Sequence, residues 1–566
     1  MRTPRARRRS FGPIGMLLAL ALVISACGGA DTTDDAPTDD ADAGDETTED
    51  TDDDDADDAP AAAGSCEDTV IRIGTNADSR NPNPLIVVDT DGFWRSDMMF
   101  DPLVMLDPET LEPGPGLAVE WDIADDDVTY SFTIADNVNF HDGEHLTTAD
   151  IEFTILSILD PDYLGPFQSE WQVLEGAPEV SEGASDYPSG MEIIDDYNFT
   201  LTLSEPQAAF AANVLTDLKP VPKHLLEGEG PIGEDHPYSL APVGYGPYQF
   251  DSWDQGNQFN MVANDDYWNG DVCIQRVEQV VIGDMNALVV AVETGDLDAT
   301  IMPPPQELPR LDELEGISVF PLPPERPEGI FFNVEADSVS DPLVRQAIAR
   351  AIDNETFVEQ FILGTTEVSR SWITYAVWAY DEDVQSPGYD PDMAADLLAE
   401  AGYPDGDGLV VELAYNEGNI FREQYATYVQ DQLGQLGVEV TISTAEWGTF
   451  IDTVFNLGYE SNTQAARAGV PDPADIGEHY GTDGGANYSG YSNPEVDRLL
   501  NEATLTSDID ERTALYSEVQ EILAEDLPFV PGYWRPNNLV VSDDFGGIVP
   551  SVLGAYHNLK DWTVDR

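Results

Sequence analysis

Few residues of this chain have the type and spacing that chemistry requires. The six histidines are scattered, except that His141 and His145 flank Asp142, Gly143 and Glu144. Imidazoles and carboxylates grouped in this way can bind a transition metal. The glycine inside the group fits a loop at the end of a strand better, so we expect no metal there.

Common catalytic motifs are missing from the sequence. It contains no Gly-Lys dipeptide of a phosphate-binding P-loop, no GxSxG nucleophile elbow and no HExxH zinc motif. Pairs of acidic residues, which glycosidases use, occur throughout the chain and are therefore uninformative. The sequence predicts neither an enzyme nor a cofactor. A secreted hydrolase stays a remote alternative that would need a catalytic constellation.

The chain begins with a segment that contains five arginines, and a short apolar run follows. This run ends in Ile24-Ser25-Ala26, directly before Cys27, the first of three cysteines. A basic segment, an apolar segment too short to span a bilayer and small residues are typical of a secretory signal. The tetrapeptide resembles a bacterial lipobox, so we expect residues 1–26 to be removed and Cys27 to carry lipid. A chance cysteine after an ordinary signal is the alternative. Residues 8–11 also resemble a twin-arginine signal, which leaves the export route open.

With Cys27 acylated, the two remaining cysteines are Cys66 and Cys273. An even number of cysteines in an exported protein favours a disulfide over reactive thiols.

The chain is strongly acidic, with a net charge of −87 and only three lysines. Residues 31–58 contain sixteen Asp or Glu and no basic residue. Such a segment buries too little apolar surface to fold, so residues 27–65 are predicted to form a disordered tether, with a cation-binding tail as the alternative. The negative field argues against nucleic acid and anionic membrane surfaces as partners. Adaptation to salt is its simplest explanation.

About 500 residues remain, too many for one core, and predict two or three domains. Strands are expected at residues 70–74, 128–134 and 199–203, and a helix after Thr147 or Thr148. From residue 341 onward helices and strands alternate, which indicates an α/β domain. The expected elements there begin at Asp341-Pro342, Asp390-Pro391, Leu409, Phe421, Val438, Asn493-Pro494 and Asp508.

A series of short motifs, in the same order, resembles the solute-binding proteins of peptide-type ABC importers. The matching stretches run from about residue 70 to the end: Gly116–Trp121, Val128–Phe132, Val138–Gly143, Leu146–Asp150, Pro222–Leu225, Pro242–Tyr248, Asn264–Trp268, Thr294–Asp298, Val344–Ile348, Tyr389–Pro391, Ala401–Tyr403 and Tyr488–Pro494. The chain is therefore identified as a member of this family, which includes oligopeptide- and dipeptide-binding lipoproteins.

The resemblance implies an α/β, three-domain periplasmic-binding-protein-like fold, in which two lobes close on a central ligand cleft and one domain is an insertion. The implied segments are 66–100, 250–330 and 541–566 for domain I, 101–249 for domain II and 331–540 for domain III. It places Cys66 and Cys273 together in domain I, so we expect a disulfide between them.

The resemblance also suggests ligand-binding residues. Ala466-Arg467-Ala468-Gly469 is similar to a segment of oligopeptide-binding members whose arginine meets a peptide carboxylate. Asp472, or Asp475, is the candidate for the amino group. Here Val470-Pro471 replaces the usual continuation, so a surface or interdomain ion pair is the alternative for Arg467. Aromatic candidates for the cleft are Phe332, Trp372, Tyr375, Trp378, Tyr415 and Trp447, and about half of these are expected in the core.

The predicted function is that of a lipid-anchored extracytoplasmic receptor that captures peptides or similar solutes. Its implied partners are the solute, a membrane permease with its ATPase subunits, and the membrane through the lipid anchor. Other ligands of the same family are the alternatives: an opine, an oligosaccharide or a metal chelate. A solute sensor acting through a membrane kinase also stays open.

Overall fold

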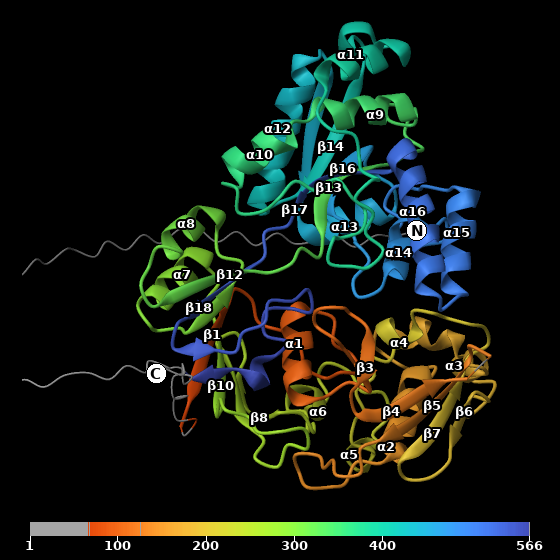
Figure 1. The fold of residues 1–566 in the computed structure, drawn as a ribbon, viewed down its shortest axis with the longest axis vertical. Coiled ribbons are helices and arrows are strands. Elements are labelled where there is room, and N and C mark those ends of the chain that lie inside the picture. The colour runs from red at the N-terminus through yellow and green to blue at the C-terminus, as the bar shows by residue number, and fades with distance from the viewer. Residues whose placement is uncertain (1–65, 67, 125, 565–566) are drawn as a thin grey trace, which may run out of the picture. The chain divides into compact units, whose positions relative to one another are not determined.

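The structure is a computed structural model that describes residues 66, 68–124 and 126–564 (Figure 1). Cys27, the expected signal 1–26 and the whole of the expected tether 27–65 lie outside the described residues. Within those ranges, no helix combines the length and the apolar character that crossing a membrane requires.

The largest sheet has seven strands drawn from three distant chain segments. β1 pairs in parallel with β10 and β11, and the other pairs of this sheet are antiparallel. In spatial order the strands are β12 (Ile317–Pro321), β18 (Asn538–Ser542), β11 (Ala299–Ile301), β1 (Val70–Thr75), β10 (Arg276–Val281), β9 (Gln258–Ala263) and β8 (Tyr248–Asp254).

An antiparallel sheet of four strands comes early in the chain and includes the strands expected near residues 128 and 199. Its order is β4 (Ala118–Ile123), β5 (Thr129–Ile134), β7 (Asn198–Thr202) and β6 (Met191–Ile193). Helix α2 (Thr148–Leu159) begins at the expected place. Its N-cap Thr147 accepts a hydrogen bond from the Ala149 amide, and Asp150 accepts one from the Thr147 amide. This reciprocal capping satisfies two donors at the helix start.

The third sheet has five strands, in the order β15 (Glu439–Ala445), β14 (Val410–Asn416), β16 (Ser461–Ala465), β13 (Pro327–Phe332) and β17 (Phe529–Trp534). Five of its helices begin within a residue of the starts that the sequence predicts. Asp341, Asp390 and Asn493 are N-caps, each followed by proline at the first helical position. The helices are α9 (Pro342–Ala351), α11 (Pro391–Glu400), α12 (Ile420–Gln435), α15 (Pro494–Thr504) and α16 (Ile509–Asp526).

Two short crossovers, residues 322–326 and 535–537, join the seven-stranded sheet to the five-stranded one. They run side by side, since the Leu322 amide donates to Asn537 O at 3.0 Å and the Arg535 amide donates to Arg326 O at 3.1 Å. The seven- and four-stranded sheets share one apolar core, and the five-stranded sheet has its own. The expected boundaries at 249, 330 and 540 each fall inside a strand, because β8, β13 and β18 begin a few residues earlier. The domain limits themselves stay a prediction.

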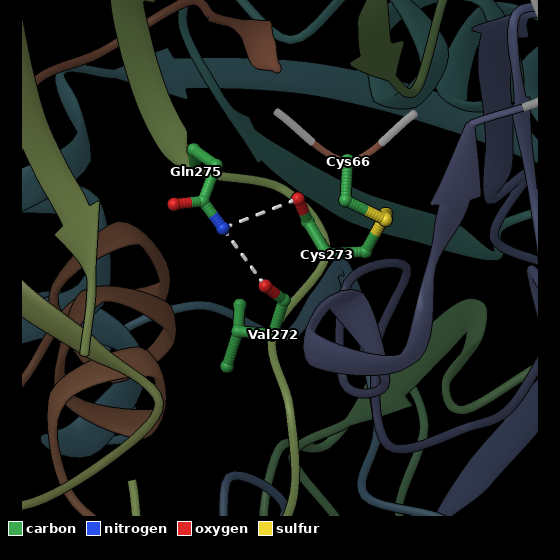
Figure 2. The surroundings of a disulfide bond; sticks show 4 residues. All are labelled: Cys66, Val272, Cys273 and Gln275. Carbon is green, nitrogen blue, oxygen red and sulfur yellow. Dashed lines mark hydrogen bonds between the residues drawn. A yellow bond between two sulfur atoms is a disulfide. The ribbon is translucent and has the colours of Figure 1, made fainter. Parts of the chain in front are cut away.

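The disulfide expected between Cys66 and Cys273 is present, with Cα atoms 4.9 Å apart (Figure 2). The Gln275 amide holds the adjoining turn, since its Nε2 donates to Val272 O at 3.0 Å and to Cys273 O at 3.5 Å. The bond therefore ties the chain before β1 to the segment that leads into β10, and these two strands pair in parallel.

Candidate functional site

A cavity of about 750 Å³ is lined by both halves of the molecule. The half with the seven- and four-stranded sheets contributes α1 (Thr90–Met99), the 3-10 helix η1 (Phe167–Val173), α4 (Phe210–Asn213) and residues 553–560. The other half contributes parts of residues 467–478, including the 3-10 helix η4 (Pro473–Ile476). A volume of roughly 300–1,000 Å³ is typical of small-molecule sites.

Arg467 lies on the cavity wall, as its candidate role requires. Its Nη1 contacts Asp475 Oδ1 at 2.5 Å, and its side chain keeps 44% of its surface exposed. Gly469 has a φ of +82°, a conformation that residues with a Cβ rarely adopt. It turns the chain after Arg467 so that Val470 and Pro471 also line the cavity.

Asp472 does not line the cavity, contrary to the expectation that it meets a ligand. Its two carboxylate oxygens accept hydrogen bonds from Arg512 Nη2 at 2.6 Å and Nη1 at 3.0 Å. Both side chains are buried. Because Arg512 on α16 binds both oxygens of its carboxylate, Asp472 stabilises the five-stranded half. Of the two candidate aspartates, only Asp475 lines the cavity.

The aromatic candidates also lie away from the cavity wall. Phe332 and Trp372 are fully buried in the core beside the five-stranded sheet. The Trp372 Nε1 donates to Phe529 O. Tyr415 is on β14, and Trp447 begins α13 (Trp447–Phe455) with an exposed side chain. Phe332 is core because every residue of β13 is buried, which is typical of a sheet covered on both faces. Trp372 lies outside β13 and belongs to the same apolar cluster.

Charged residues that the sequence did not single out as a site line the same cavity. Two of the three lysines of the chain, Lys219 and Lys560, are among them. Lys219 is almost fully buried and donates to Asp97 Oδ1 at 2.5 Å. The scarcity of lysine in the sequence was the available signal, because a buried ammonium in so acidic a chain needs a specific reason.

Asp101 is bound by two side chains of the motif Asn264–Trp268. It accepts hydrogen bonds from the Tyr267 hydroxyl at 3.0 Å and from Trp268 Nε1 at 2.7 Å. Burial raises the pKa of Asp101 to about 6, although Trp268 and Tyr267 oppose the rise. The Tyr267-Trp268 pair thus positions a carboxyl group at the cavity wall.

His141 and His145 have separate structural partners. His141 Nε2 donates to Gly246 O and its Nδ1 accepts from the Gly244 amide, both at 3.2 Å. Burial lowers the pKa of His141 to about 4. His145 contacts Asn139 and Tyr197 instead. In the part of the chain that the structure describes, no group of His, Cys, Asp and Glu could hold a metal ion.

Comparison with known proteins gives consistent matches along the chain. A profile described as "Bacterial extracellular solute-binding proteins, family 5 Middle" matches residues 112–488. The chain is 26% identical to the oligopeptide-binding protein AppA of Bacillus subtilis (strain 168) over 576 residues, which is 99% of each chain.

Solved structures resemble the whole fold. The structure of AppA from Bacillus subtilis in complex with a nonapeptide matches with a TM-score of 0.74 at 26% identity, over 88% of this chain and 99% of that one. NikZ from Campylobacter jejuni, in complex with Ni(L-His), also has a TM-score of 0.74, at 23% identity over 87% and 99% of the two chains. At that identity the second match shows the fold alone.

Proposed function

Because the chain belongs to the bacterial extracellular solute-binding proteins of family 5, we propose that it captures peptides in the cavity that Arg467 lines. In this role the protein closes around its solute by motion at the two crossovers. It then presents the solute to a membrane permease and its ATPase subunits, held at the outer face of the membrane through lipid on Cys27.

The observation that carries this proposal is the position of Arg467 on a cavity formed by two separately cored halves. A guanidinium presents a planar pair of donors that fits a carboxylate. With Asp475 already at 2.5 Å, Arg467 still has much of its surface exposed for a second anion. The C-terminal carboxylate of a peptide is the ligand group that this arrangement fits best.

The proposal is tested by calorimetry with trialanine and its C-terminally amidated form, on the parent protein and Arg467→Ala. We expect the parent to prefer the free carboxylate, and Arg467→Ala to lose about 2–5 kcal/mol of binding free energy for it. Arg498→Ala is the matched control, because Arg498 has a similarly exposed side chain, paired with Glu495 and Glu502. Equal affinity for both peptide forms, or an unaffected Arg467→Ala protein, contradicts the role.

Native mass spectrometry of the purified protein separates peptides from the other solutes of the family. A co-purifying mass that fits an opine, an oligosaccharide or a metal chelate would replace the peptide as the ligand.

A further inference from the structure

The cavity lining contains more acidic than basic side chains. Six carboxylates line it and only three cationic side chains do. The carboxylates are Asp97, Asp101, Glu170, Asp217, Asp475 and Glu478, and the cations are Lys219, Arg467 and Lys560.

Each of the three cations already has a carboxylate partner. Arg467 pairs with Asp475 and Lys219 with Asp97, both at 2.5 Å. Lys560 Nζ contacts Asp561, outside the cavity lining, at 2.7 Å. Each cationic side chain of the cavity lining, among the described residues, therefore already has a carboxylate partner.

Within the described ranges, four of the six carboxylates have no cation partner. Asp101 accepts from Tyr267 and Trp268 instead, and Glu478 accepts from the Gly485 amide at 3.0 Å. That leaves Glu170 on η1 and Asp217 shortly after α4. Among the residues that the structure describes, neither side chain has a hydrogen-bond or ion-pair partner. Glu170 faces Asp217 and Glu478, which repel its charge, and Arg467, which attracts it. Glu170 is an exposed residue at the rim of the cavity, and partial desolvation there, then the charge of Asp217, raises the pKa of its carboxyl to about 7. Burial also raises the pKa of Asp217, with Lys219 opposing and Asp97 adding to the rise.

His557 adds a neutral acceptor to the same lining. Its Nδ1 lies 2.9 Å from Gly554 O, a carbonyl that only accepts, so Nδ1 holds the ring proton. Its Nε2 then has a lone pair, and no donor in the described part of the chain reaches it. Burial lowers the pKa of His557, which keeps the ring neutral.

We propose that the cavity selects solutes that carry an ammonium or guanidinium group in addition to the α-ammonium common to all peptides, and that Glu170 and Asp217 receive this additional cation. This inference rests on the proposed solute-binding function and narrows its substrate class to cationic solutes, such as peptides with lysine or arginine. A cation between the two carboxylates removes their mutual repulsion and gives both a hydrogen-bond donor. Arg467 remains available for the carboxylate of the same zwitterionic peptide.

Calorimetry with the full-length protein tests the inference with four probes: trilysine, trialanine, triglutamate and the non-peptide cation 1,5-diaminopentane. We expect trilysine to bind tightest among the peptides. Glu170→Gln and Asp217→Asn should each lower the affinity for trilysine by roughly ten- to hundredfold. The affinity of each variant for trialanine should stay within about twofold of the parent value. Glu182→Gln is the control, because Glu182 is an exposed glutamate of the same part of the chain that does not line the cavity.

The thermal unfolding temperature of each unliganded variant checks its fold. Glu170→Gln removes a repulsion, so its unfolding temperature at pH 8 should equal or exceed that of the parent. Loss of trilysine binding in a stable variant then reports the missing carboxylate.

The outcomes also separate this inference from the proposed function. If peptides bind without regard to charge and Glu170→Gln has no effect, the inference is wrong and peptide capture stands. If no peptide binds but 1,5-diaminopentane binds and depends on Glu170 and Asp217, the cationic site stands and peptide capture is wrong. Binding of triglutamate as tight as trilysine, or no binding of either cation, overturns the inference.

Discussion

Removal of the Asp472 carboxylate is expected to destabilise the half built on the five-stranded sheet and to leave ligand affinity unchanged. The exposed side-chain surface is 7% for Asp472 and 3% for its partner Arg512. The guanidinium of Arg512 has two further contacts. Its Nε donates to Ala503 O at 3.1 Å, and its carbon lies 5.0 Å from the centre of the Trp378 ring. It cannot swing to water, so Asp472→Ala leaves a buried, unpaired guanidinium.

The expected cost follows from that burial. Removing one partner of a buried ion pair costs about 3–5 kcal/mol. For a domain of roughly 150–250 residues, 1 kcal/mol corresponds to about 2–4 °C, so the transition of this half should fall by about 6–20 °C. Asp472 also caps η4, because its Oδ1 accepts from the Ala474 amide at 2.9 Å. Asp472→Asn retains an acceptor for the cap and so isolates the loss of charge.

Differential scanning calorimetry, with the transitions of the two halves resolved, measures this effect. Asp510→Ala is the control, since Asp510 is an exposed aspartate in the first turn of α16. The double variant Asp472→Leu/Arg512→Met should recover most of the stability, because no charge is left buried without a partner. An unchanged transition together with weaker peptide binding in Asp472→Asn would refute the reasoning and return Asp472 to the ligand site.

Four further predictions follow from the sequence and the structure. Cys27→Ser should release the protein from the membrane fraction, as blotting of fractionated cells would detect; retention there would place the anchor elsewhere. Replacing Cys66 and Cys273 together by serine should lower the free energy of unfolding by up to about 5 kcal/mol, because the disulfide closes a very long loop; denaturant titration measures this, and an unchanged midpoint contradicts it. The unfolding temperature should rise with NaCl concentration, since salt screens the self-repulsion of a chain with a net charge of −87; a flat or falling trend would count against it. Affinity for trilysine should rise as pH increases through about 7, because the raised pKa of Glu170 keeps its carboxyl protonated below that value and a bound cation favours the ionised form. Calorimetry at several pH values measures this rise, and the affinity of Glu170→Gln should not show it.

The fold class and the family could be predicted from the sequence because their signals are local. An aspartate or asparagine before proline, when an apolar helical period follows, favours a helix start, and Asp341, Asp390 and Asn493 all cap helices. Alternating apolar residues mark strands such as β5 and β7 in the same way. These signals depend on neighbours in sequence, so tertiary contacts did not overturn them.

The site could be predicted only where a motif points to it. Arg467 was found through its resemblance to a family segment, and it lies on the cavity wall. The position of Asp472 away from the cavity wall could not be foreseen, because its partner, Arg512, is 40 residues further along the chain. No local pattern reports that pairing. Glu170 and Asp217 were missed for a similar reason, since two more acids in a chain with 110 carry no signal until the fold brings them to one cavity.

The placement of the few basic residues connects the acidic composition to the site. Several are buried and serve as internal ties: Arg95 to Asp78, Arg422 to Glu328, Arg512 to Asp472 and Lys219 to Asp97. A buried guanidinium or ammonium needs such a partner, and each one held inside is unavailable at the surface or in the cavity. With basic residues so scarce, the cavity keeps more carboxylates than its own cations can pair. This scarcity agrees with the inference that a cationic group of the solute pairs with Glu170 and Asp217.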